Sequence, residues 1–182
     1  MNLDATGIAF LKKEEASGKP ALVAFKNKND VWTIGYGNTY YENGTKVKQG
    51  DTITAQRAET LFYNIFNQFA KQVSSVLKKP VTQNQFNALV SYAYNRGFGA
   101  FKASKVLALV NQNPNNIQAI QNQLVLEWGT NQTYKTALIN RRKREGVLYA
   151  TGASSGSYLL PILALAGITF LFINSYSNEQ HR

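Results

Sequence analysis

The sequence predicts an α+β domain with two lobes, a small antiparallel sheet and a group of helices, joined by one long helix. Two observations lead to this class. Residues 21–48 read as short strands and turns. From Thr54 onward the apolar residues recur at helical spacing. Because so small a sheet cannot bury a core alone, the helices must complete the fold, and we expect a cleft between the two lobes.

The first element is a short amphipathic helix near the N-terminus. Asp4 suits its N-cap, and the segment 17–20, with its glycine and proline, ends it. Ile8, Leu11 and Glu15 lie between these limits at helical spacing. The Glu15 carboxylate therefore faces whatever this helix packs on, although the spacing also fits a surface glutamate at a helix end.

The run 31–39 is the centre of the predicted sheet. Its β-branched and aromatic residues suit a strand, whereas Gly35 and Gly37 lack a Cβ and allow another backbone or a ligand to approach. Asn43 and Gly44 follow between two arms of strand-like residues. This pattern predicts a hairpin with a type I′ turn.

The long helix begins after Thr54, a good N-cap, and Pro80 marks its end. About 24 helical residues span ~36 Å, enough to connect two lobes. Thr82 and Gln85 form a capping-box signature for the next helix, which Gly97 closes. Shorter helices are expected at 101–110, 116–126 and 134–149.

Composition limits the chemistry available. At 182 residues and 44% apolar content the chain allows one domain, placed at 1–150. It has no cysteine, and its one histidine, His181, is the penultimate residue. These facts exclude disulfides, a thiol nucleophile and a Ser-His-Asp triad, and they argue against a zinc site. Acid–base chemistry falls to carboxylates, and no metal or cofactor is implied.

The formal net charge of +10 favours an anionic partner. Nucleic acid and the bacterial envelope both qualify, but no recognition-helix or RNA-binding signature is present. The basic run 141–144 is interpreted as a solvated face. By the positive-inside tendency it favours a cytoplasmic globular domain if the chain is anchored in a membrane.

The C-terminal part of the chain changes composition abruptly. Residues 151–157 form a Gly/Ser-rich flexible linker, and 158–173 carry no charge. Extended to 176, the segment reaches roughly 28 Å as a helix, close to the thickness of a bilayer core. We therefore expect a transmembrane anchor at 158–176, a short polar tail at 177–182 and no N-terminal signal peptide. The alternative is a buried helix that packs on the core.

Four segments resemble the phage-type lysozymes, or endolysins, of glycoside hydrolase family 24, and the likeness extends from about Gly7 to Tyr149. They are the glycine-rich strand 31–39, the helix segment 11–16, the central helix 82–95 and the segment 140–145. The resemblance implies a lysozyme-like fold and cleavage of the β-1,4 bond between N-acetylmuramic acid and N-acetylglucosamine in peptidoglycan. Its partners would be glycan strands, with no nucleic acid and a monomeric catalytic domain.

Glycoside cleavage uses a proton donor and usually a second carboxylate. The resemblance assigns the donor to Glu15, which partial burial would keep protonated near neutral pH. It also assigns Thr33 to a pair that holds the attacking water, but the aspartate expected six residues earlier is Asn27. Asparagine can orient water but cannot take up a proton.

Three outcomes remain open for the missing base. In the first, Asp30 supplies the carboxylate, and in the second Glu15 acts alone, as in lytic transglycosylases. In the third, the chain is a non-catalytic wall-binding virion protein, and a basic nucleic-acid binder is a further class. Retained glycan cleavage is favoured because Glu15 and Thr33 persist.

The resemblance further implies saccharide contacts at five positions, which are Thr39, Tyr94, Asn95, Ser104 and Asn122. Each has a structural alternative, such as a core aromatic at Tyr94. The complete prediction is a phage muramidase for host-wall lysis or penetration, anchored in a host membrane or in a lipid-containing virion.

Overall fold

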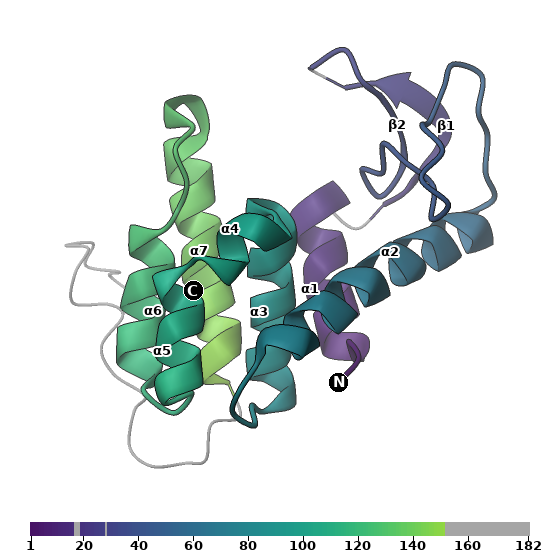
Figure 1. Ribbon diagram of the computed structural model, residues 1–182. Helices are drawn as coiled ribbons and strands as arrows, with labels where there is room; N and C mark the ends of the chain where they lie inside the picture. The colour runs from purple at the N-terminus through teal and green to yellow at the C-terminus, as the bar shows by residue number, and fades with distance from the viewer. Residues whose placement is uncertain (17–18, 28, 152–182) are drawn as a thin grey trace, which may run out of the picture.

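The computed structural model describes residues 1–16, 19–27 and 29–151, which form a sheet lobe and a helical lobe (Figure 1). This is the α+β arrangement predicted from the sequence. In chain order the elements are α1 (Ala5–Ala16), β1 (Ala21–Lys26), β2 (Trp32–Gly35), α2 (Ala55–Val76), α3 (Gln83–Arg96), α4 (Phe98–Lys102), α5 (Lys105–Gln112), α6 (Ile117–Leu126), the 3-10 turn η1 (Gln132–Tyr134) and α7 (Lys135–Ala150).

The sheet consists of β1 and β2, which pair antiparallel with Phe25 opposite Thr33. The predicted strand at 31–39 is too long, because β2 ends at Gly35. Gly35 and Gly37 have φ values of +62° and +95°, which glycine adopts without strain. These two residues fold the chain back so that Ile34 and Asn38 exchange backbone hydrogen bonds of 2.9 Å.

The second hairpin forms as predicted, but its turn type was wrong. Tyr40 and Lys46 make an antiparallel bridge, and the Gly44 N–H donates to the Tyr41 carbonyl at 3.0 Å. A type I′ turn needs positive φ at both central residues, whereas here Gly44 has φ +82° and Asn43 does not have a positive φ. The loop is therefore a three-residue connection with glycine at its last position.

The long helix α2 runs from below the sheet lobe into the helical lobe (Figure 1). Its N-cap is Thr54, whose side chain accepts from the Arg57 N–H, as predicted. The capping box of Thr82 and Gln85 at the start of α3 is also confirmed. The single helix expected at 101–110 is wrong. It is divided into α4 and α5 because Ser104 caps α5, its hydroxyl accepting from the Leu107 N–H at 3.0 Å.

The core of the helical lobe surrounds α3, whose residues 85–93 are all buried. This helix packs against α1, α2, α4 and α7. A row of four aromatic rings connects the sheet lobe to α3. The distances between successive ring centroids are 5.0 Å for Tyr36 and Phe62, 4.4 Å for Phe62 and Phe66, and 4.2 Å for Phe66 and Tyr94. The two lobes therefore share a continuous apolar contact.

The predicted membrane anchor at 158–176 and the tail at 177–182 lie outside the described residues, as does the linker after Thr151. Within the part of the chain that the structure describes, none of the helices has the length and apolar character needed to cross a bilayer.

Candidate active site

Glu15 lies in the last turn of α1, where the chain leaves the helical lobe for the sheet lobe (Figure 1). Its side chain is 18% exposed and that of Arg141 is 8% exposed. The Arg141 Nη2 donates to Glu15 Oε1 at 2.7 Å, joining α1 to α7. The Glu15 carboxylate is thus held by a buried guanidinium, unlike an unrestrained surface glutamate.

The glycine-rich turn of the sheet lobe lies beside this end of α1. A Cβ atom added to Gly37 would stand 3.7 Å from the backbone oxygen of Glu15. Asn38 is buried in the same turn, and its Oδ1 accepts from the Tyr36 N–H at 3.3 Å. The conformation of this turn therefore brings the sheet lobe next to the residue predicted to donate a proton.

The basic run 141–144 is not a solvated face, so that interpretation was wrong. Arg141 and Arg142 are buried, and only Lys143 and Arg144 are exposed. Both buried guanidiniums contact Glu145, which lies one helical turn further along α7 and is itself fully buried. A counterion at i+3 and i+4 makes the burial of two positive charges tolerable.

The electrostatics of this group follow from its burial. Burial lowers the pKa of Arg141, but the Glu15 and Glu145 carboxylates outweigh this effect and raise it. Burial lowers the pKa of Arg142 and raises that of Glu145. The pKa of the Tyr94 hydroxyl is raised by burial and further by the negative charge of Glu15, so Tyr94 lies within electrostatic reach of Glu15.

Two of the predicted saccharide contacts lie at the end of α3 in this region. Tyr94 packs on Phe66 and on Phe69, with ring centroids 4.2 and 5.1 Å away. The Asn95 Oδ1 accepts from Arg142 Nη2 at 2.9 Å. Tyr94 therefore contributes to the core as well as to the surroundings of Glu15.

Asn27 and Thr33 are hydrogen-bonded to each other, with Asn27 Nδ2 donating to Thr33 Oγ1 at 3.0 Å. The Asn27 Oδ1 accepts from the backbone N–H groups of Asn29 and Val31, which fixes the orientation of the amide. The Thr33 hydroxyl donates to the Val31 carbonyl at 3.0 Å. Asn27 therefore stabilises the turn between β1 and β2 through its Oδ1 and donates a hydrogen bond to Thr33 through its Nδ2.

Asp30 belongs to the same turn but differs from Asn27 in its surroundings. It has a positive φ of 59°, and its side chain is 77% exposed. The carboxylate pairs with Lys26 Nζ at 2.7 Å, whereas Thr33 bonds to Asn27 and Val31. This arrangement does not favour Asp30 as the missing base.

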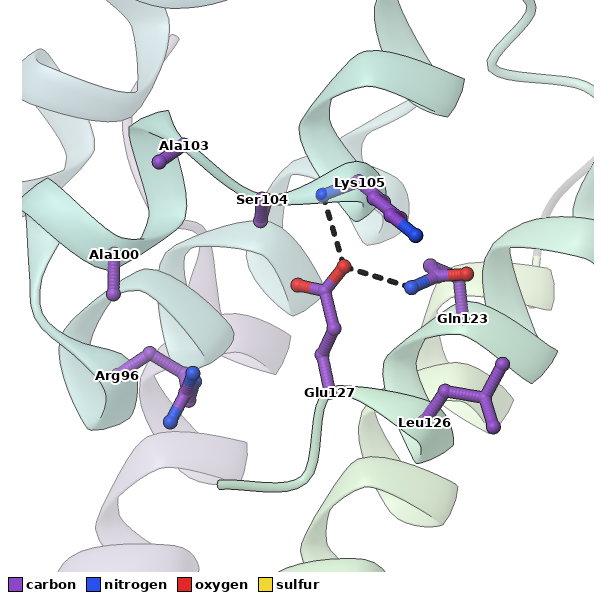
Figure 2. A pocket seen from close by; sticks show the side chains of 8 residues that line it. All are labelled: Arg96, Ala100, Ala103, Ser104, Lys105, Gln123, Leu126 and Glu127. Atoms are coloured by element: carbon purple, nitrogen blue, oxygen red, sulfur yellow. Dashed lines mark hydrogen bonds between the residues drawn. The ribbon is translucent and has the colours of Figure 1, made fainter. Parts of the chain in front are cut away.

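Ser104, Asn122 and Thr39 are the other three predicted saccharide contacts. Ser104 contributes to an open pocket of about 610 Å³ between α4, α5 and α6 (Figure 2). In that pocket Glu127 Oε1 accepts from the Lys105 N–H at 2.9 Å and from Gln123 Nε2 at 2.8 Å, as Figure 2 shows. Asn122 is exposed on α6, where its Oδ1 accepts from the Gln118 side chain. Thr39 accepts from the Val47 N–H through its backbone carbonyl.

Comparison with known proteins identifies the family. The family model described as phage lysozyme matches residues 17–145. The endolysin of Salmonella phage P22 is 34% identical over 149 residues, which cover 82% of this chain and 98% of that protein. This chain belongs to the phage lysozyme family. The lysozyme-like fold predicted from the sequence is confirmed by an endolysin structure from Escherichia coli O157:H7 phage FAHEc1, with a TM-score of 0.74, 30% identity and coverage of 83% of this chain and 94% of that one.

Another phage lysozyme relative is longer. The endolysin of Bacillus phage B103 is 36% identical over 156 residues, which cover 85% of this chain but 56% of that protein. This chain thus spans a little over half the length of that relative.

The sequence did not identify the buried group of α7 as part of the candidate site. Arg141, Glu145 and Ser91 contact Glu15 or one another, yet none was predicted as a site residue. One signal was available, because a glutamate three and four residues after two arginines can neutralise both on one helix face. The contact between Glu15 and Arg141 spans 126 residues and has no local signature.

Proposed function

We propose that this protein is a phage endolysin that acts as a muramidase on the glycan strands of peptidoglycan. The proposed cleavage is at the β-1,4 bond between N-acetylmuramic acid and N-acetylglucosamine. Membership of the phage lysozyme family supports the substrate class. The observation that carries the proposal is the contact of the Glu15 carboxylate with the buried Arg141, next to the glycine-rich turn of the sheet lobe.

In the proposed reaction Glu15 donates its proton to the glycosidic oxygen. The bond between that oxygen and the anomeric carbon of the muramoyl residue breaks, and the sugar becomes an oxocarbenium-like cation. Glu15 is left as a carboxylate. Arg141 lies 2.7 Å from that carboxylate and stabilises the negative charge.

The fate of the cation depends on Asn27 and Thr33. In hydrolysis a water molecule attacks the anomeric carbon, and its proton returns to the Glu15 carboxylate. Neither Asn27 nor Thr33 acts as a proton acceptor in this step, because the Asn27 amide donates to Thr33 and the Thr33 hydroxyl donates to Val31. Their role is limited to orienting the water.

Asn27 also supports a second candidate reaction, which is lytic transglycosylation. There the 6-hydroxyl of the muramoyl residue attacks its own anomeric carbon and gives its proton to Glu15. No water enters, and a 1,6-anhydro ring forms. A single acid–base residue is sufficient for this route, so the absence of a carboxylate at position 27 is not an obstacle.

The test is digestion of purified sacculi by the full chain, with mass spectrometry of the released muropeptides. Reducing ends indicate hydrolysis, and ends lighter by one water indicate transglycosylation. Glu15→Gln should lower product release by about 10²-fold or more, since it removes the general acid, while binding to sacculi is retained.

The matched control is Glu14→Gln, which removes a carboxylate that pairs with Arg144 at 2.6 and 2.8 Å on the neighbouring position of α1. It should retain activity. Intact sacculi after long incubation with the parent chain would instead support the non-catalytic wall-binding protein.

We further propose that residues 158–176 anchor the protein in a host membrane or a virion lipid layer. The full chain should float with vesicles of neutral phosphatidylcholine and remain bound at high salt, because apolar insertion is not screened. Release by salt from anionic vesicles, with no binding to neutral ones, would attribute membrane binding to the net charge of +10 instead.

A further inference from the structure

Glu145 is the centre of a hydrogen-bonded group buried between α3 and α7. Its Oε1 accepts from Ser91 Oγ at 2.7 Å, from Arg142 Nη2 at 2.9 Å and from Arg141 Nε at 3.1 Å. Its Oε2 lies 2.8 Å from Arg142 Nε. One carboxylate thus contacts two guanidiniums.

The two guanidiniums extend from Glu145 to different residues. Arg141 Nη2 donates to Glu15 Oε1 at 2.7 Å, and Arg142 Nη2 donates to Asn95 Oδ1 at 2.9 Å. Arg142 is also held over the ring of Tyr92, 4.9 Å from its centroid. Each arginine therefore connects Glu145 to a different residue of the predicted site.

Stability alone is a poor explanation for this group. A buried set of ion pairs contributes little net stability relative to apolar residues that fill the same space, because desolvation offsets the attraction. The group does restrict two long side chains that would otherwise have many rotamers. A residue that donates a proton and a residue that contacts a saccharide both need a fixed orientation, and guanidinium N–H groups held in place provide it.

We propose that Glu145 is a positioning residue, which holds Arg141 against Glu15 and Arg142 against Asn95. Through Arg141 it orients the proton donor and so affects kcat. Through Arg142 it orients Asn95 and so affects KM. This inference rests on the proposed glycan cleavage. It assigns a role to a residue that contacts neither Glu15 nor Asn95 directly but acts on both through the two arginines.

The test compares full-length variants on soluble glycan strands prepared from peptidoglycan, with kcat and KM corrected for the folded fraction. Glu145→Gln keeps the shape of the side chain but removes its charge and one acceptor oxygen. It should lower kcat about tenfold or more and raise KM several-fold. A purely structural residue would change the folded fraction but neither constant.

The two routes are separated by combining variants. Asn95→Ala should raise KM with little change in kcat. In the Asn95→Ala background, Glu145→Gln should still lower kcat but should raise KM no further, because the residue through which it acts on KM is absent. Full additivity on KM would overturn the route through Arg142.

The control is Glu42→Gln, which breaks another carboxylate–guanidinium pair, with Arg57 in the sheet lobe, by the same charge change. It should leave both constants unchanged. If Glu145→Gln does not fold, Ser91→Ala replaces it, since that variant removes one donor to Glu145 and keeps both ion pairs of Glu145. The kcat of Ser91→Ala should fall about threefold.

Values of kcat and KM within twofold of the parent in a folded Glu145→Gln would overturn the proposal, as would such values in Ser91→Ala where Glu145→Gln does not fold. Glu15→Gln, measured in parallel, separates this result from a failure of the proposed function. An active Glu15→Gln refutes the function itself, whereas an inactive Glu15→Gln beside a fully active Glu145→Gln or Ser91→Ala refutes only the positioning role.

Discussion

Gly7 provides a sharp test of how α1, and with it Glu15, is fixed to the core. It is buried in the first turn of α1 against Asn87 of α3. A Cβ added at Gly7 would lie 2.5 Å from Asn87 Oδ1 and 2.6 Å from Asn87 Cγ. Contacts this short do not occur, so Gly7→Ala must displace Asn87 or move α1 away from α3.

The expected cost can be worked out from three effects. Overpacking a dense core costs about 1–3 kcal/mol. Displacing Asn87 also weakens the N-cap, because Asn87 Nδ2 donates to Asp4 Oδ1 at 2.7 Å, and a cap contributes about 1 kcal/mol. Alanine recovers up to about 1 kcal/mol of helix propensity. Gly7→Ala should therefore lower the free energy of unfolding by about 1–3 kcal/mol.

The assay is urea unfolding of the full chain, followed by circular dichroism. The matched control is Gly99→Ala in α4, where an added Cβ meets no atom within 4 Å. That variant should be neutral or more stable by up to about 1 kcal/mol. Equal stability of the two variants, or a stabilised Gly7→Ala, would refute the packing argument. Because α1 carries Glu15, the activity of Gly7→Ala should fall as well.

Two further predictions concern the sheet lobe. Asn27→Asp keeps an acceptor for the turn and places a carboxylate oxygen on the Thr33 hydroxyl, so the share of hydrolysed products should rise; an unchanged product ratio by mass spectrometry would contradict this. Hydrogen bonds from Arg57 lower the pKa of Glu42 to about 2, against burial, which raises it. Because the unfolded chain takes up this proton first, the contribution of the pair is complete above pH 4.5 and disappears as the pH falls toward 2. Since the Arg57 side chain is 39% exposed, Glu42→Gln should lower the free energy of unfolding by only about 1 kcal/mol at pH 7. This difference between parent and variant should shrink in unfolding curves measured in acid, and a difference that stayed constant would be inconsistent with the pair.

The boundaries of several helices could be predicted because capping depends on residues within one turn of each other. Thr54, and Thr82 with Gln85, start α2 and α3 where the pattern indicated. The same local reasoning was wrong at Ser104, which was assigned to a helix interior, because serine fits a cap as well as an exposed helical position.

Turn geometry was predicted less well. Asn43 and Gly44 fit more than one hairpin loop, and the choice depends on the register of the flanking residues. The side chain of Glu42 in this loop accepts hydrogen bonds from Arg57 and Asn64 on α2, a contact that the sequence pattern does not reveal.

The sequence by itself determined the class of this protein, the order of its elements and the candidate proton donor, because periodicity and capping are local and the family motifs are read along the chain. Only the tertiary structure decided the surroundings of that donor. Glu15 and Arg141 are brought together by the packing of α1 and α7 on α3, and Arg142 is buried because Glu145 and Asn95 accept from it. Charged residues look the same in sequence whether water or a distant carboxylate solvates them, so their burial emerges only when the chain is folded.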